Sequence, residues 1–197
     1  MGQVISREDT VFMFDMDETV YNLTKEVIKW YNKDFNDNFN WKDNKEYFWD
    51  STPKGNRDYF ANLLVDDTKR VFRNGQPIKG MVEFINELVS KGYRVYFVTN
   101  PEKKGQAYQD KIAWLEDNFR WFDKNKHFIA TAKKELLARP NRVLVDDYPE
   151  YLNNWSRNGG ISIGFGDNNW TREFNGYKVK DANELRELIK IAEMWKE

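Results

Sequence analysis

The chain contains no cysteine, which excludes disulfide bonds and metal sites built from thiolates. It also lacks an apolar run long enough to span a bilayer, and a charged start followed by an apolar stretch, so we expect a cytosolic protein. No charge of one sign dominates, because 31 lysine and arginine residues face 32 aspartate and glutamate residues. This balance excludes the strong overall basic field of a non-specific nucleic-acid binder and is compatible with a small anionic substrate.

Two common catalytic arrangements are missing too. His127 is the only histidine and no Gly-x-Ser-x-Gly motif precedes it, which argues against a serine hydrolase; we expect this histidine in a loop or partly buried. No Gly-x4-Gly-Lys-Ser/Thr sequence occurs, which argues against an ATP-hydrolysing P-loop protein. Carboxylates are therefore the best candidates for chemistry.

Three short apolar runs are typical of buried strands, and polar side chains follow each of them. The runs are 11–14, 93–98 and 142–145, and they end in Asp15-x-Asp17, Thr99-Asn100 and Asp146-Asp147. Helical spacing of apolar residues marks 78–90 and 106–118; a further strand is expected at 161–165 and a terminal helix at 182–195. This alternation predicts an α/β fold with a parallel sheet flanked by helices, whose motifs meet at the carboxyl edge of the sheet.

The stretch between the first two runs, residues 21–77, is too long for a single crossover helix and holds much of the aromatic content. Its pattern predicts a helix at 23–35, then a polar loop and shorter helical pieces. We interpret it as a small, mainly helical cap inserted after the first strand of a single domain, whose core comprises residues 1–20 and 78–197. Most of its aromatic side chains are expected to form the cap's own core, and a minority are candidates to stack on a base.

The aspartates after the first run have two interpretations. On its own, Asp15-x-Asp17 is more often a strand-ending turn, because aspartate bonds its own backbone there. The convergence of three polar strand ends favours chemistry instead, since a carboxylate at a strand end can act as a nucleophile or hard-metal ligand, and a second one nearby as acid and base. Mg2+ is the metal that such oxygen ligands favour.

The four motifs, in their order, resemble those of the haloacid dehalogenase (HAD) superfamily of phosphotransferases: residues 15–20, Thr99-Asn100, a downstream lysine and Asp146-Asp147. Other stretches are similar to the 5'(3')-deoxyribonucleotidases of that superfamily, namely Pro101, residues 110–115, Phe119, and Phe72 ahead of residues 77–80. The resemblance covers nearly the whole chain. It implies a HAD-like fold and the hydrolysis of (deoxy)ribonucleoside monophosphates to nucleoside and phosphate.

The resemblance also implies a role for each acidic motif residue. Asp15 would attack the phosphorus and form an aspartyl-phosphate, and Asp17 would act as acid and then as base. Mg2+ would be held by Asp15, the backbone carbonyl of Asp17 and Asp146. Asp147 would orient Lys111 or the waters of the metal.

The phosphate would contact Thr99, the backbone N–H of Asn100 and a lysine. Similar deoxyribonucleotidases carry that lysine on the helix after the second motif, a position that corresponds to Lys111. Many other members of the superfamily place it before the last motif, where Lys133 and Lys134 stand. These two lysines therefore remain alternatives to Lys111.

Two departures from the family pattern leave the nucleoside selectivity open. The usual glycine after the second aspartate is Glu18 here, and a common aromatic residue is replaced by Leu23. The candidate substrate-binding residues are Tyr21, Phe72, Trp49 and Lys134.

The alternative substrates are other small phosphate esters, such as a sugar phosphate. A non-catalytic binding protein of the same fold is the other alternative, which the intact motif residues disfavour. Neither a membrane nor a nucleic-acid polymer is an expected partner. A homodimer is common among similar nucleotidases but has no signal in this sequence.

Overall fold

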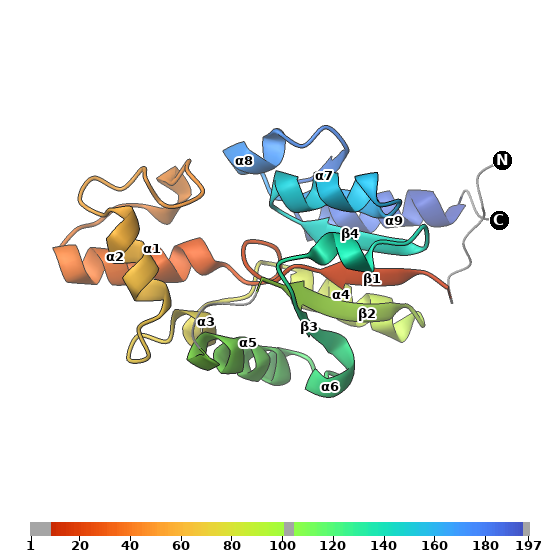
Figure 1. The fold of residues 1–197 in the computed structure, drawn as a ribbon, viewed down its shortest axis with the longest axis horizontal. Helices are drawn as coiled ribbons and strands as arrows, with labels where there is room; N and C mark the ends of the chain where they lie inside the picture. The colour runs from red at the N-terminus through yellow and green to blue at the C-terminus, as the bar shows by residue number, and fades with distance from the viewer. Residues whose placement is uncertain (1–8, 101–104, 195–197) are drawn as a thin grey trace.

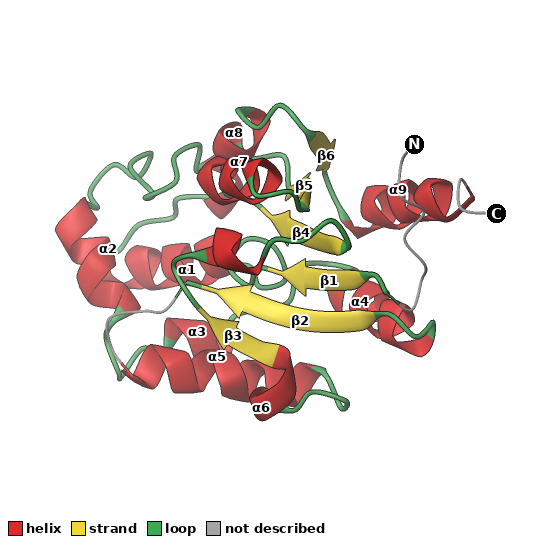
Figure 2. Cartoon of the chain, turned by 45° about the vertical axis from the view of Figure 1, so that its right-hand side comes forward, coloured by secondary structure: helices red, strands yellow, loops and turns green. Residues whose placement is uncertain are grey.

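The computed structural model describes residues 9–100 and 105–194, and a parallel sheet of six strands forms its centre (Figure 2). The strands are β1 (Val11–Phe14), β2 (Arg94–Thr99), β3 (Phe128–Ala130), β4 (Arg142–Asp146), β5 (Ile161–Phe165) and β6 (Tyr177–Val179). Their order across the sheet is β3-β2-β1-β4-β5-β6, and each neighbouring pair is parallel. The predicted parallel sheet is confirmed.

Helices cover both faces of the sheet, because successive strand residues point to opposite faces and both sets are apolar. On one face, Phe12 and Phe97 are buried together with residues of α4 (Met81–Ser90), α5 (Gly105–Asn118) and α9 (Ala182–Met194). On the other face, Met13 and Leu144 are buried with Trp155 of α7 (Pro149–Arg157). The α/β fold flanked by helices is therefore confirmed, although the predicted end of the last helix at Trp195 lies outside the described residues, as does Pro101.

Shorter elements connect these layers: α6 (Lys124–His127), α8 (Asn169–Arg172) and the 3-10 turns η1 (Trp41–Asp43) and η2 (Lys134–Leu137). The ring of His127 is half-buried, and its Nδ1 accepts a hydrogen bond from the N–H of Asp123 at 3.0 Å. The expectation of a partly buried histidine is confirmed. In the ranges that the structure describes, none of the helices has the length and apolar character needed to cross a bilayer.

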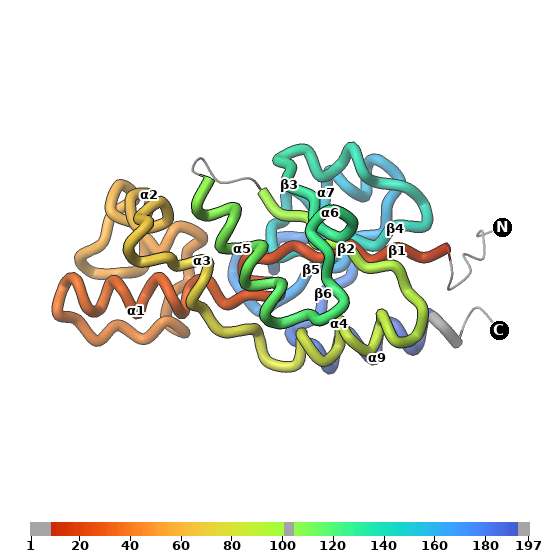
Figure 3. The backbone as a smooth tube through the Cα atoms, turned by 90° about the horizontal axis from the view of Figure 1, so that it is seen from below, coloured from red at the N-terminus to blue at the C-terminus, as the bar shows by residue number. Residues whose placement is uncertain are grey.

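The cap segment, residues 21–77, contains α1 (Leu23–Phe35), α2 (Arg57–Leu64) and α3 (Val71–Asn74). Figures 1 and 3 show α1 and α2 beyond the carboxyl ends of the strands. Helix α1 has the predicted bounds, because Asn22 caps its start by accepting the N–H of Lys25 at 3.0 Å, and Asn36 ends it in a left-handed conformation at φ 46°.

Two backbone connections join the cap segment to the sheet, and they run side by side. The N–H of Asn22 donates to the carbonyl of Gln76 at 3.0 Å, and the N–H of Ile78 donates to the carbonyl of Val20 at 2.9 Å. The cap segment thus enters and leaves the fold at one place.

Tyr21 fills this junction. Its hydroxyl donates to the carbonyl of Val71 and accepts the N–H of Gly75 at 2.9 Å. Its ring meets Trp114 edge-on at 5.2 Å between centroids and is only 1% exposed. The structure does not support Tyr21 as a substrate-binding residue, because its ring is buried in the junction.

A methyl group at position 75 tests this packing. A Cβ at Gly75 would overlap with the phenol of Tyr21, and the backbone cannot easily yield, because the indole N–H of Trp114 donates to the Gly75 carbonyl at 2.9 Å. We expect Gly75→Ala to lower the free energy of unfolding in urea by about 1–3 kcal/mol, the usual cost of overpacking. The control is Gly105→Ala, whose Cβ meets no described atom within 4 Å and should cost less than about 0.5 kcal/mol. Equal losses in the two variants would contradict the tight junction.

Candidate active site

Two carboxylates meet where β1 and β4 end. The strands pair with Phe14 opposite Val145, and the N–H of Asp15 donates to the carbonyl of Val145 at 2.9 Å. This register brings Asp15 and Asp146 together at the carboxyl edge of the sheet, where both are buried. With Asp147 they form a group in which one carboxylate oxygen from each residue lies within 4.8 Å of the others.

Lys134, at the start of η2, partly neutralises this group. Its fully buried Nζ donates to Asp15 Oδ1 at 2.5 Å and to Asp146 Oδ2 at 2.8 Å. Burial alone would lower the pKa of Lys134, but the charges of Asp146 and Asp15 outweigh it and raise that pKa. Burial raises the pKa of Asp15 to about 7, against the opposing charge of Lys134. The lysine therefore stays charged, and Asp15 and Asp146 share its ammonium group.

Lys111, on α5, links the first motif to the second. Its Nζ donates to Asp17 Oδ2 at 2.7 Å and to Thr99 Oγ1 at 3.0 Å, and its side chain is buried. Lys111 and Lys134 therefore both reach the motif residues. Lys133 does not share this position, since its side chain is exposed and lies near Glu135.

Asp147 is held in place by α8. The indole N–H of Trp170 donates to Asp147 Oδ2 at 2.8 Å, and the hydroxyl of Thr171 donates to the Asp147 carbonyl at 2.8 Å. Burial, and next the charge of Asp146, raises the pKa of Asp147 well above its usual range. The sequence predicted that Asp147 orients a lysine or metal-bound waters, whereas the structure places it within the carboxylate group itself.

A cavity of about 220 Å3 opens over these carboxylates. Its polar lining comprises Asp15, Asp17, Glu18, Thr24, Asn100, Asp146 and Asp147. Its aromatic lining comprises Tyr47, Phe48 and Trp49 of the cap segment and Tyr148, Tyr151 and Trp170. The Tyr47 ring lies 4.7 Å from the Tyr148 ring and 5.7 Å from the Trp170 ring, between centroids, so the cap segment contacts residues that follow β4 and β5 at this cavity.

The cap candidates differ in position. Trp49 lines the cavity, and its indole N–H donates to Thr24 Oγ1 at 2.9 Å. Phe72 is 2% exposed and is not among the cavity residues; its ring instead lies 4.5 Å from Lys111 Nζ. The predicted contact of Phe72 with the substrate is therefore not supported, and Phe72 contacts a phosphate-binding candidate.

Sequence reasoning missed most of the aromatic lining. Tyr148 directly follows the last motif, so its place after a strand end was a usable signal. Tyr47 and Trp170 carry no such signal, because their place at the cavity depends on contacts between distant parts of the chain.

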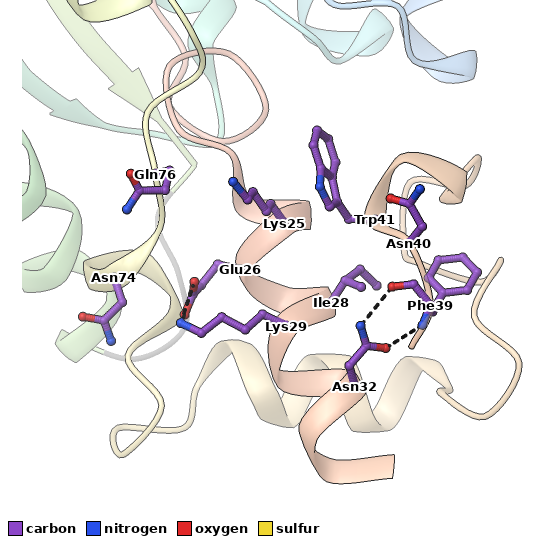
Figure 4. Close-up of a pocket in the computed structure, with 10 residues that line it drawn as sticks. All are labelled: Lys25, Glu26, Ile28, Lys29, Asn32, Phe39, Asn40, Trp41, Asn74 and Gln76. Atoms are coloured by element: carbon purple, nitrogen blue, oxygen red, sulfur yellow. Dashed lines mark hydrogen bonds and ion pairs between the residues drawn. The ribbon is translucent and has the colours of Figure 1, made fainter. Parts of the chain in front are cut away.

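A larger cavity, about 590 Å3, lies on the cap segment beside α1 (Figure 4). Its lining includes Lys25, Trp41 and Gln76, and its one carboxylate, that of Glu26, is paired with Lys29 at 2.9 Å. The residues that line this cavity include no group of carboxylates. The chemistry therefore belongs to the smaller cavity.

The carboxylate group fits a hard divalent cation. Asp15, Asp146 and Asp147 offer only oxygen ligands. Burial and their mutual repulsion raise the pKa of Asp15 and of Asp147, so a cation bound among them would favour their charged forms. Within the described residues, Asp17 Oδ1 is a buried oxygen without a hydrogen-bond partner. Mg2+ prefers such oxygen sites, which it completes with phosphate oxygens and waters.

Solved structures of HAD hydrolases are similar to this fold. A HAD-family hydrolase from Deinococcus radiodurans with bound phosphate and sodium has a TM-score of 0.63 and 13% identity, over 94% of this chain and 96% of its own. A Bacillus subtilis protein assigned to the HAD hydrolases, bound to magnesium, has a TM-score of 0.61 and 15% identity, over 91% and 98%. A predicted phosphatase from Clostridium acetobutylicum has a TM-score of 0.59 and 15% identity, over 92% and 98%. Identities this low establish the fold alone.

A search of curated proteins found no match to this chain. A family model does match, over residues 9–195, and its description is "5' nucleotidase, deoxy (Pyrimidine), cytosolic type C protein". The match spans all four motifs. The chain therefore belongs to the cytosolic type C 5'-nucleotidase family and is a phosphatase of the HAD type.

Proposed function

We propose that this protein is a Mg2+-dependent phosphatase that hydrolyses (deoxy)ribonucleoside monophosphates to nucleoside and phosphate. The observation that carries this proposal is the aromatic lining of a cavity that also holds the catalytic carboxylates. Tyr47 and Phe48 are 39% and 48% exposed, so their rings offer free surface. Flat bases stack on such rings, whereas a sugar leaving group gains less from them.

The metal would be held by Asp15 and Asp146, with the Asp17 carbonyl and Asp147 as further oxygen ligands. When bound, Mg2+ supplies positive charge that offsets the repulsion between these carboxylates and a phosphate dianion. That repulsion is roughly 4 kcal/mol for each pair of unit charges at 4 Å under surface-like screening. Dependence on a divalent cation follows from the charges of the site.

The reaction would begin when the Asp15 carboxylate attacks phosphorus in line. The bond from phosphorus to the nucleoside oxygen breaks, an acyl phosphate forms on Asp15, and Asp17 gives its proton to the departing oxygen. Water then attacks the same phosphorus and loses a proton to Asp17. Inorganic phosphate leaves, and the Asp15 carboxylate is restored.

The two lysines would position the transferring group. Lys111 already joins Thr99 and Asp17 by hydrogen bonds, so it aligns a phosphate ligand with the acid–base residue. Lys134 holds Asp15 in a fixed orientation and adds positive charge beside the attacking oxygen. Phosphoryl transfer depends chiefly on such positioning and charge stabilisation. The backbone N–H of Asn100, a residue that lines the cavity, would complete the phosphate site.

Phosphate release from a panel of deoxynucleoside monophosphates, ribonucleoside monophosphates and sugar phosphates tests the proposal. We expect release with Mg2+, fastest from nucleotides, and loss of release with EDTA. Asp15→Asn should lower kcat by at least about 1000-fold without a change in folding, because it removes the nucleophile. Release from sugar phosphates alone would discard the nucleotide substrate, and no release from any ester would favour the binding-protein alternative.

The aromatic lining predicts a selective effect of Tyr47→Ala. Loss of the ring should raise KM for nucleoside monophosphates about tenfold, since stacking on a base contributes about 1–3 kcal/mol, and should change KM for ribose 5-phosphate little. Tyr177→Ala is the matched control, because Tyr177 is 66% exposed and lies outside the cavity. Equal changes for the nucleotide and the sugar phosphate would show that Tyr47 does not contact the base.

A further inference from the structure

We propose that Glu18 is a charge filter for the leaving group: its carboxylate rejects phosphate esters whose leaving group carries a second negative charge. The inference rests on the proposed function of the same cavity, which Glu18 lines together with Asp15 and Asp17. It assigns a specificity-determining role to a side chain that the proposed reaction steps do not use.

The backbone gives no reason for a glutamate at this position. Glu18 has a φ of 56°, a left-handed conformation that glycine adopts freely and a glutamate adopts with strain. The turn enforces this conformation, because the Glu18 N–H donates to the Tyr21 carbonyl at 2.8 Å. Strain of this kind at a site points to a function of the side chain.

The side chain is fixed at the cavity. Oε1 of Glu18 accepts the N–H of Thr24 at 2.5 Å, in the first turn of α1. Thr24 in turn accepts the indole N–H of Trp49, which also lines the cavity. The carboxylate therefore lies between the catalytic turn and the cap segment, next to the space that a leaving group would fill.

The two lysines of the site pair with carboxylates other than that of Glu18. Lys134 is paired with Asp15 and Asp146, and Lys111 is paired with Asp17. These lysines and the metal would compensate the transferring phosphate. The Glu18 carboxylate, held at the cavity by the Thr24 N–H, adds a negative charge on the leaving-group side above neutral pH, because burial raises its pKa to about 7. A neutral nucleoside can donate a hydroxyl or amino hydrogen bond to such a carboxylate. An anionic leaving group meets repulsion, which is stronger in a partly desolvated cavity than in water.

Glu18→Gln isolates the charge, because glutamine has nearly the same shape and keeps an oxygen that can accept the Thr24 N–H. Binding is measured by titration calorimetry with Mg2+ at about pH 8.5, where a carboxyl group with a pKa of about 7 is ionised. The Asp15→Asn background is used so that no ester is hydrolysed. Two ligand pairs differ by one anionic group: a deoxynucleoside 5'-monophosphate with its 3',5'-bisphosphate, and glycerol 3-phosphate with 3-phosphoglycerate. We expect Glu18→Gln to tighten binding of the anionic member about tenfold or more relative to its partner in both pairs.

Glu46→Gln is the matched control, because it removes one charge from an exposed position of the cap segment beside Tyr47, outside the cavity lining. It should change both ratios less than about twofold, since an exposed charge is screened. Ratios that stay unchanged in Glu18→Gln, with a lower melting temperature, would mean that Glu18 only caps α1 and would overturn the filter. A shift seen with the glycerol pair while neither nucleotide binds would support the filter and overturn the nucleotide substrate. No binding of any ester would overturn both.

Discussion

The ammonium group of Lys134, held between Asp15 and Asp146, is the interaction on which the site depends. The pairing of β1 with β4 forces these two carboxylates together at the sheet edge, and both are buried. Without a cation between them, their repulsion and desolvation would oppose that strand register, because buried charges destabilise a fold when they lack a partner. The fold of the central strands and the charge of the site are therefore coupled.

The topology explains why two lysines reach this edge. β1 lies between β2 and β4, and each parallel crossover must return along the sheet before the next strand begins. α5, which follows β2, carries Lys111 to Thr99 and Asp17, and η2, which precedes β4, carries Lys134 to Asp15. Lys134 pairs with the nucleophile candidate Asp15, and Lys111 pairs with the acid–base candidate Asp17. Each of these two carboxylates therefore has its own positive partner.

The sequence predicted the features that depend on interactions between neighbouring residues, namely the bounds of helices and the ends of strands. The bounds of α1 follow from its asparagine caps, and the strand ends follow from apolar runs that stop at polar residues. α4 begins at Met81 and not at residue 78, because Gly80 precedes it in a left-handed conformation at φ 83°. The positions of Tyr21 and Phe72 could not be predicted in this way, since Trp114 and Lys111, which hold them, are distant in the sequence.

The turn between β1 and α1 links the chemistry to the selectivity of the cavity. Within ten residues it supplies the nucleophile candidate Asp15, the acid–base candidate Asp17, the carboxylate of Glu18, and Asn22, which caps the N-terminus of α1. A shift of α1 would move Thr24, to which Glu18 is bonded, and with it Trp49 at the aromatic lining. The carboxylates of the sheet edge are held separately by β4 and Lys134. Substitutions in the cap segment are thus able to change which leaving group fits while the phosphate chemistry stays the same.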